Sequence, residues 1–549
     1  MFMKKMFILS CWIFLGNSNA ADLIEPRSIH NKDQFNNQLY NDDYLRIVLK
    51  FHDGSGVRSN SRGHLMIKPE LQNSATLRQR GLNTRQISND VLAINRYLDQ
   101  LKLQSNQLIN GLESDFKNEK EKAEQYWQKE MAELPTYQQL LLKDGGQNPM
   151  LALWVRTLNT FPSLEIAYAE PIAMPPINEE LATPPAPWKS CNAVPIDPAA
   201  GDLSEFQGYL GTPPVGMNTD LLNQLPGGLG SGIRIIDVEG GYLPHSDHKS
   251  LFQNIGHTTQ YGIDHGSAVI GIIGSQHNDI GLNGLAPNAS IGLRSIYNKN
   301  LFDDLNSAGN SSANVAHHLY WAAKHSIQGV VLIELQRYSA EEPDCTCNFN
   351  AVVPCRWTPL EYWPAEFDTI QNATGNGTVF VEAAANGSRS LDSTIFNTCT
   401  NGHCFDRSVR DSGAILVSGS LTDGVTPFCG KPGRPNYGSR IDVHSWGEQI
   451  PNTFIDGGNY LYQGISHCNN YYEDFGGTSG ASAIIAGAVT ALQGAYYAAT
   501  GSRLDALSMR ETLRVTGTPQ TPMNVDGHDI LIGPHPNLTD ALQYALDNF

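Results

Sequence analysis

The chain is poor in charged residues, and basic side chains are the minority among them. Charged residues make up 17% of the 549 positions, against roughly a quarter in an average globular protein, which argues against bulk disorder and against a solvated coiled coil. With 37 Lys and Arg against 55 Asp and Glu, the formal net charge is -18. Such a chain repels phosphate backbones and gains nothing from counterion release, so we expect no nucleic-acid partner.

Beyond its first twenty residues the sequence has no apolar run long enough to cross a membrane. Lys4 and Lys5 precede a short apolar run, and Ala20 places a small residue before Ala21. This pattern is typical of a secretory signal peptide cut after Ala20, because the run is about half the length of a membrane anchor. A lipoprotein signal at Cys11 is a second interpretation, disfavoured by the very short apolar run before it. We expect a secreted or periplasmic protein without a membrane partner.

Cysteine is absent between residues 21 and 190, and the cysteines that remain after signal removal all lie further along the chain. Their number is even, which favours disulfides in an exported protein. The sequence does not fix the pairing, and Cys399 with Cys404 and Cys429 with Cys468 are guesses. One residue separates the cysteines of Cys345-Thr346-Cys347, too few for a usual zinc-binding pair, so a disulfide is favoured there too.

The uneven cysteine distribution predicts two folded units, within the two to four that a chain of this length suggests. A proline-rich stretch at residues 171 to 188 suits an extended linker or a cleavage region between them. We therefore divide the chain into a signal peptide (1–20), an N-terminal domain (21–190) and a C-terminal domain (191–549).

The N-terminal domain shows strand and helix patterns. Residues 44 to 51 have strand character, and residues 164 to 168 are a candidate partner strand. Between them, residues 88 to 133 contain no proline and carry apolar side chains at helical spacing, followed by a charged run at 119 to 133. We expect a long helical insertion whose charged run is a solvated face.

The C-terminal domain alternates apolar runs with helical ones. Five runs rich in Val and Ile lack the polar alternation of a half-exposed sheet and are predicted to be strands buried on both faces: residues 233–238, 290–296, 330–335, 378–385 and 415–420. Helical patterns follow Ser311 or Ser312, His265 and Ser479. This order predicts an α/β fold with a parallel sheet and helices on both sides.

Three polar residues stand where a strand ends or a helix begins: Asp237, His265 and Ser479. Each alone has an ordinary structural explanation, such as a capping group or a satisfied histidine. Together they can make a nucleophile, because a serine hydroxyl needs an imidazole to take its proton and a buried carboxylate to hold that imidazole. The order Asp, His, Ser along the chain is the order that subtilisin uses.

The sequence around these residues resembles the subtilisin-like serine proteases, the subtilases. The matching segments are 236–238, 265–271, 284–289, 383–387, 436–438 and 477–487. The resemblance covers roughly residues 205 to 520. It implies a subtilisin-like three-layer fold, catalysis by Asp237, His265 and Ser479, and a small N-terminal α+β propeptide, which residues 21 to 190 resemble weakly.

The resemblance also implies that Asn386 is the oxyanion asparagine. Attack on a peptide carbonyl builds negative charge on oxygen, and a donor fixed in advance stabilises that charge. The backbone N–H of Ser479 would be the second donor. Asn386-Gly387-Ser388 is also a glycosylation sequon, but a glycan would block the site, so we interpret that match as accidental.

The chain departs from the family at the substrate-binding edge. Glu334, Leu335 and Gln336 stand where most subtilases have Ser-Leu-Gly, and we expect all three to contact substrate. Glu334 would narrow the cleft or favour a basic side chain before the cut. Pairing of Glu334 with an internal arginine is an equally strong alternative. A Val and a Glu also follow Asp237 where the family usually has Ser or Thr and Gly.

No cofactor is expected for this chemistry. Subtilases often bind calcium, and acidic loops such as Asp303-Asp304 exist, but no ligand set with a recognisable spacing can be assigned. His245 and His248 are better explained as structural residues than as metal ligands, and we leave the metal ligands unassigned.

These observations predict a secreted serine endopeptidase made as a self-processed precursor, acting on polypeptides and binding its own N-terminal domain. We expect a monomer. The alternative is a subtilase-fold binding protein with little or no activity on other proteins, and a structural exported protein whose N-terminal helices bind a partner is a third interpretation.

Overall fold

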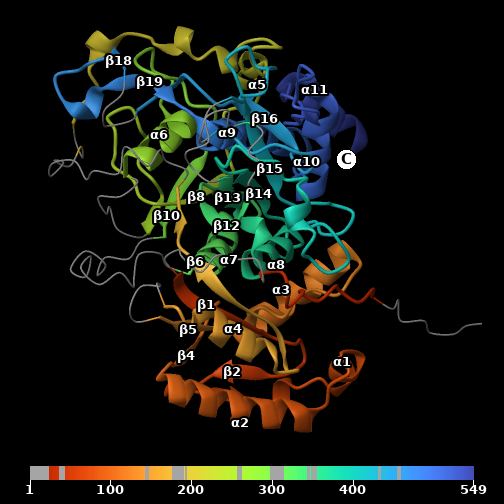
Figure 1. The fold of residues 1–549 in the computed structure, drawn as a ribbon. Coiled ribbons are helices and arrows are strands. Elements are labelled where there is room, and N and C mark those ends of the chain that lie inside the picture. The colour runs from red at the N-terminus through yellow and green to blue at the C-terminus, as the bar shows by residue number, and fades with distance from the viewer. Residues whose placement is uncertain are drawn as a thin grey trace, which may run out of the picture.

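The computed structural model describes residues 24–35, 44–142, 148–175, 191, 194–255, 263–296, 314–342, 347, 355–430, 434–453 and 459–549. The predicted signal peptide and most of the proline-rich linker lie outside these residues. Figure 1 shows an N-terminal part, with β1, β4, β5 and β6, seated beneath a larger C-terminal part. The N-terminal part runs to residue 175, and the C-terminal part begins at residue 191.

A seven-stranded sheet forms the centre of the C-terminal part. Its order is β16-β15-β14-β11-β8-β10-β9, and every neighbouring pair is parallel. The strands are β8 (Arg234–Glu239), β9 (Gln253–Ile255), β10 (Ser290–Ser295), β11 (Val330–Ile333), β14 (Val379–Ala383), β15 (Ile415–Ser420) and β16 (Val443–Trp446). The five predicted strands are all present, so the predicted α/β fold with a parallel sheet is confirmed.

Helices cover both faces of this sheet because alternate residues of each strand point to opposite sides. Ile235 of β8 and Leu332 of β11 pack against α6 and α9, whereas Ile236 and Val331 pack against α7 and α8. The helices of the C-terminal part are α5 (Thr219–Asn223), α6 (Ile263–Gly274), α7 (Val315–Ser326), α8 (Pro364–Thr374), α9 (Gly477–Thr500), α10 (Ala506–Thr516) and α11 (Leu538–Asn548).

The predicted cap of α7 lies two or three residues before the cap that the structure shows. Asn314 caps α7, and its side chain accepts a hydrogen bond from the backbone N–H of His317. The candidates Ser311 and Ser312 lie outside the described residues.

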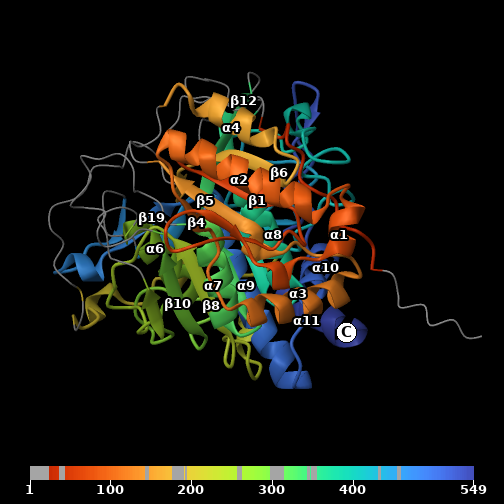
Figure 2. The same cartoon turned by 90° about the horizontal axis from the view of Figure 1, so that it is seen from below.

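The N-terminal part is a four-stranded antiparallel sheet in the order β4-β5-β1-β6. One face packs on its own helices α2 and α4, and the other meets the C-terminal part. Figure 2 shows these strands lying between α2 and α8. The elements are β1 (Tyr44–Phe51), β2 (Val57–Ser59), β3 (Leu65–Ile67), α1 (Ser74–Gln79), α2 (Thr84–Leu101), β4 (Ser105–Gln107), α3 (Glu113–Trp127), β5 (Tyr137–Leu141), α4 (Leu151–Asn159) and β6 (Leu164–Pro171).

The two predicted strands at 44–51 and 164–168 pair as expected, but the helical insertion is not continuous. Helix α2 ends at Lys102, which adopts a left-handed backbone with φ of 56°, and β4 then joins the sheet before α3 begins. The break follows from Ser105, Asn106 and Gln107, which pair with β5 instead of extending the helix. Helical periodicity on either side hides such a short edge strand in the sequence.

Small sheets complete the fold. A two-stranded ribbon joins β2 and β3, and another joins β20 (Asn524–Val525) and β21 (His528–Asp529). The remaining sheets are β13-β12-β7 and β17-β19-β18. Their strands are β7 (Ala173–Met174), β12 (Gln336–Glu342), β13 (Cys355–Pro359), β17 (Ile450–Asn452), β18 (Tyr460–Tyr462) and β19 (Tyr471–Phe475).

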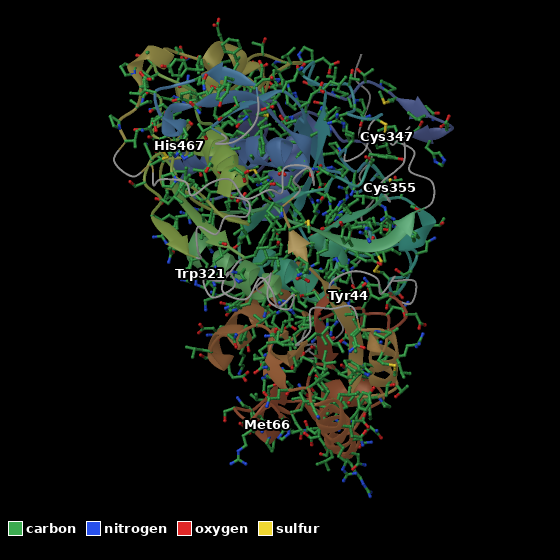
Figure 3. All side chains as sticks on the ribbon, turned by 60° about the vertical axis from the view of Figure 1, so that its left-hand side comes forward. Tyr44, Met66, Trp321, Cys347, Cys355 and His467 are labelled. Carbon is green, nitrogen blue, oxygen red and sulfur yellow. A yellow bond between two sulfur atoms is a disulfide. The ribbon has the colours of Figure 1, made fainter. Side chains whose placement is uncertain are left out.

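Three disulfides are described: Cys191–Cys468, Cys347–Cys429 and Cys399–Cys404. The guess of Cys399 with Cys404 is confirmed. The guess of Cys429 with Cys468 is wrong, because both cysteines pair with residues far away in the sequence. Cys355 is also disulfide-bonded, and Figure 3 shows it on the same side of the molecule as Cys347, away from His467. Within the described part of the chain, no helix combines the length and apolarity that a membrane span needs.

A buried ion network links the helix layers to β15 and β16. Arg440, fully buried, binds both oxygens of Glu361 at 2.7 and 2.8 Å and Asp442 at 2.6 Å. Breaking such a network by removing one partner leaves an uncompensated buried charge.

Arg440→Met should therefore lower the free energy of unfolding by about 3–5 kcal/mol, since Glu361 loses its bidentate cation and Asp442 loses one of its arginine partners. The exposed Arg62→Met is the matched control and should change it by less than about 0.5 kcal/mol. Urea unfolding followed by near-ultraviolet circular dichroism measures both, with Ser479→Ala present in each chain to prevent any self-digestion. Equal midpoints for the two variants would contradict the stabilising role of the network.

Candidate active site

His265 is the third residue of α6 and is 2% exposed. Its Nδ1 atom lies 2.8 Å from the Glu239 carboxylate oxygen Oε2. The approach is close because position 266 is glycine: a Cβ there would lie 1.9 Å from Gly241 O and 2.3 Å from Glu239 Oε1. Glu239 therefore fixes the orientation of the imidazole ring.

The sequence prediction that Asp237 holds this ring is wrong. Asp237 and Glu239 are two residues apart on β8, so they face the same side of the sheet, but only Glu239 ends the strand beside α6. Asp237 lies two residues before Glu239, further from the end of β8, and is paired with Leu332 of β11. Both of its carboxyl oxygens lack a hydrogen-bond partner in the described structure. Strand periodicity and the sheet-edge position of Glu239 were signals in the sequence that could have identified it.

Burial disfavours charge throughout this site. It lowers the pKa of His265 to about 4, an effect that Asp264 opposes. Burial also raises the pKa of Glu239 well above its usual value, with Asp264 adding to the rise and the Gly241 N–H opposing it. For Asp237, burial and then the neighbouring Glu239 raise the pKa.

Ser479 is the third residue of α9 and is fully buried. The turn before it passes through Gly477, whose φ of 70° favours glycine. Helices α6 and α9 pack directly together, and the Phe475 ring centroid lies 5.3 Å from that of His265. Among the described residues, neither Ser479 Oγ nor His265 Nε2 has a hydrogen-bond partner. The structure thus brings the two residues to neighbouring helix N-termini without joining them by a hydrogen bond.

Asn386 follows β14 and borders the same turn. Its Oδ1 accepts hydrogen bonds from the Thr478 N–H at 2.9 Å and the Thr478 hydroxyl at 3.0 Å. These bonds fix the amide so that Nδ2 lies against Gly477, where a Cβ would be only 2.6 Å away. Ala385, just before it, has a φ of 72°, a strained backbone of the kind that collects at functional sites.

The three residues predicted to bind substrate occupy different environments. Glu334 is fully buried, so its side chain does not line an open cleft. Its Oε1 lies 2.5 Å from Ser482 Oγ, and the predicted pairing with an arginine is not seen among the described residues. Leu335 is buried in the core beneath α7 and α8. Gln336 begins β12, and its Oε1 accepts the Asn386 N–H at 2.9 Å.

One edge of β12 is occupied by a strand that follows the N-terminal sheet. Strand β7 runs antiparallel to β12, with Met174 opposite Gln336 and Ala173 opposite Arg337. β7 follows β6 almost directly, and β6 belongs to the N-terminal sheet. This edge of β12 is therefore covered by a segment of the same chain.

The N-terminal sheet is held over α7 and α8 by buried polar and aromatic contacts. Phe35 stacks on Trp363 with ring centroids 4.7 Å apart. Asp368 of α8 lies 3.0 Å from His30 Nε2 and accepts the Tyr137 hydroxyl at 2.7 Å. Burial opposes ionisation of Asp368, but His30 and further cations lower its pKa to about 2. Buried side chains of the N-terminal part therefore bind specific partners on and beside α8.

Potential metal ligands gather at one place in the described part of the chain, around Cys191, His467 and Cys468. The two cysteines form a disulfide there, which removes them as thiolate ligands. His245 and His248, set aside as structural in the sequence, bond to Asn470 O and Thr453 Oγ1. Asp303 and Asp304 lie outside the described residues.

A family model, a sequence relative and solved structures are similar to this chain. The sequence model of the subtilase family matches residues 244–528, which include His265, Asn386 and Ser479 but begin after Glu239. The minor extracellular protease Epr of Bacillus subtilis (strain 168) is 35% identical over 82 residues, 14% of this chain and 13% of that protein.

Among solved structures, fervidolysin from Fervidobacterium pennivorans, described as a keratinolytic enzyme related to subtilisin, has a TM-score of 0.50 at 15% identity. That alignment covers 96% of this chain and 65% of fervidolysin, so the chain spans less than two thirds of either relative. The epidermin leader peptide processing serine protease of Staphylococcus aureus has a TM-score of 0.48 at 13% identity, covering 92% and 99% of the two chains. Since the family model covers more than half of its residues, the chain belongs to the subtilase family.

Proposed function

We propose that this protein is a serine endopeptidase, exported and made as a precursor that cuts itself. The observation that carries the proposal is the Glu239–His265 hydrogen bond beside the turn that presents Ser479. Family membership supports the reaction class, and the site geometry supports the roles of individual residues.

In the proposed reaction, Ser479 Oγ attacks the carbonyl carbon of a peptide bond while His265 Nε2 takes its proton. Glu239 holds the ring and stabilises the imidazolium that forms. His265 then returns the proton to the leaving amine, and water repeats the sequence on the acyl-enzyme. A hydrogen bond between serine and base is often long before substrate binds and tightens in the complex, which fits the unpartnered Oγ and Nε2 atoms.

Asn386 Nδ2 and the Ser479 backbone N–H are the proposed oxyanion donors. The Thr478 bonds hold the Asn386 amide in one orientation before the reaction, so no reorganisation is needed when charge develops. The N-terminus of α9 adds its dipole to the same point.

The N-terminal part is the proposed propeptide. β7 completes a small sheet on β12 in the manner of an extended peptide added to a sheet edge. An attached segment has a high effective concentration, so it excludes substrate until the connection is cut. We place the cut between about residues 170 and 205, as the sequence suggests. The alternative, a binding protein without activity on other proteins, rests on the covering of β12 by β7. The tests below distinguish it from an active peptidase.

Glu239→Gln should lower kcat for casein hydrolysis by about 10³–10⁴-fold, the size of loss that follows when the buried acid of a serine-protease triad is removed. Asp237→Asn is the matched control and should cost at most about tenfold, because Asp237 has no contact with the ring. Labelling of Ser479 by a fluorophosphonate should follow the same order. A larger loss for Asp237→Asn than for Glu239→Gln would return the role to Asp237.

The acid limb of the kcat profile should lie near pH 4, below the value of about 6.5 for an unperturbed histidine. Burial lowers the pKa of His265, and only the neutral imidazole accepts a proton, so activity is present above this pKa and is lost as the pH falls through it. The profile of kcat is the appropriate measurement because it reports the enzyme–substrate complex, in which bound substrate keeps the site dry. An acid limb near 6.5 would show that burial does not control His265.

Self-processing is tested by expressing the chain without any other protease. The wild type and the exposed control Ser502→Ala should be cut, whereas Ser479→Ala should keep its full length. The Cys191–Cys468 disulfide locates the cut. A cut before Cys191 frees the N-terminal part on a non-reducing gel, and a cut after Cys191 leaves it attached until a reductant is added. Trimming of Ser479→Ala at the wild-type rate would exclude self-cleavage.

A further inference from the structure

Glu334 lies directly beneath the turn that carries Ser479, a position that the proposed mechanism leaves without a role. It follows the last residue of β11, and its backbone N–H bonds to Val238 O of β8. Residues 330 and 332 of β11 face α9, so the two-residue period directs Glu334 to the same side. The side chain there is fully buried.

The contact between Glu334 and α9 passes through Ser482. Ser482 Oγ lies 2.5 Å from Glu334 Oε1, 2.6 Å from Thr478 O and 3.2 Å from Ser479 O. Ser479 Oγ is near enough to favour the charged form of Glu334, although the two make no well-aligned hydrogen bond. One carboxyl group thus supports the whole first turn of the nucleophile helix.

Glu334 Oε1 and Thr478 O compete for the single hydroxyl hydrogen of Ser482, and this constrains the protonation state of Glu334. A hydroxyl donates a single hydrogen, and a backbone carbonyl can only accept. If the Ser482 hydrogen points to Thr478 O, the second short contact needs a hydrogen from Glu334. A neutral carboxylic acid supplies that hydrogen and a carboxylate does not.

The surroundings favour the neutral acid. On this side of the sheet β8 presents Asp237 and Glu239, and α6 presents Asp264 and His265. Helix α9 carries no charged residue, and β14 turns its Glu382 to the other face, where it accepts the Glu361 N–H. Burial and then the nearby Asp237 raise the pKa of Glu334 well above its usual value. These elements carry two basic groups: Arg234 of β8 donates to His325 O at the end of α7, and burial keeps His265 of α6 neutral.

We propose that Glu334 is a positioning residue of this peptidase: its protonated carboxyl donates to Ser482 and thereby fixes the first turn of α9, including Ser479 Oγ and the Ser479 N–H. The inference rests on the proposed function, since it assigns a role within the same site. Most subtilases have a serine at this position, so the hydrogen bond from a glutamic acid to Ser482 is a feature of this chain. Loss of the proton turns a donor into an acceptor, breaks the chain of bonds and places a negative charge beside the developing oxyanion.

The test compares Glu334→Gln with Glu334→Leu in the processed enzyme. Leucine keeps the volume but removes the donor, and kcat should fall about tenfold to a hundredfold with KM little changed, because the reacting atom is misplaced while substrate contacts remain. Glutamine keeps a neutral N–H donor and should restore most of the lost kcat. In the wild type, kcat should fall at alkaline pH as Glu334 loses its proton. Glutamine cannot ionise, so in Glu334→Gln this fall should move to higher pH.

Ser482→Ala provides a second route to the same interaction if Glu334→Leu fails to fold. Its loss of kcat should resemble that of Glu334→Leu, and the double variant should lose little more than either single one, as expected for residues that act as a unit. Additive losses, or a Glu334→Gln enzyme as slow as Glu334→Leu with an unmoved alkaline limb, would overturn the positioning role.

An infrared measurement separates this proposal from the proposed function. The difference spectrum of Ser479→Ala minus Ser479→Ala/Glu334→Gln should contain the carbonyl band of a protonated carboxylic acid at neutral pH, whatever the activity. If the wild type is active but this difference spectrum lacks the band, the inference about Glu334 is overturned and the proposed function stands. A wild type that neither cleaves casein nor takes up a fluorophosphonate would overturn the proposed function, and the positioning role with it.

Discussion

The hydrogen bond between Glu239 and His265 depends on one edge of the parallel sheet, the edge at which β8, β11 and β14 end. Glu239, Glu334 and Asn386 each lie at or just beyond the last residue of one of these strands. The helices α6 and α9 begin at the same edge and add His265 and Ser479. A sheet held rigid by layers on both faces therefore sets distances that flexible loops could not maintain.

The distribution of charge differs sharply between this edge and the rest of the core. Elsewhere, several buried acids have cationic partners: Glu361 binds Arg440, and Glu366 binds Arg337 at 2.5 Å. At the catalytic edge Asp237, Glu239 and Glu334 lie near one another with only a neutral imidazole as a basic neighbour. Carboxyl groups in such a setting hold protons tightly, because neither water nor a cation stabilises the ionised form. The proposed mechanism uses Glu239 as the ionised acceptor of the His265 Nδ1–H, whereas burial favours the neutral acid at Asp237 and Glu334.

Much of this could be predicted from the sequence. Apolar strand runs and their alternation with helices identify the sheet, and glycine-rich turns mark Ser479 and His265, the proposed nucleophile and its base. The sequence favours Asp237 as the partner of His265 because the Ile-Ile-Asp pattern resembles the family. Asp237 and Glu239 share one face of β8, and the sequence does not say which of them reaches the sheet edge beside His265. Glu334 was assigned to substrate because a strand sequence does not say which side chains turn inward under a helix. Disulfide partners such as Cys191 and Cys468 depend on tertiary folding that no local pattern encodes.

Strand β12 lies between β13 and β7, and β7 covers only its first two residues. When a covering strand departs, the backbone groups that it satisfied face solvent and accept any extended chain of matching polarity. Recognition through the main chain is indifferent to most side chains, so under the proposed removal of the N-terminal part the uncovered edge would favour breadth of recognition over selectivity. The same proposal predicts a preference for unfolded polypeptides, since a chain must straighten over several residues before it can lie along the edge.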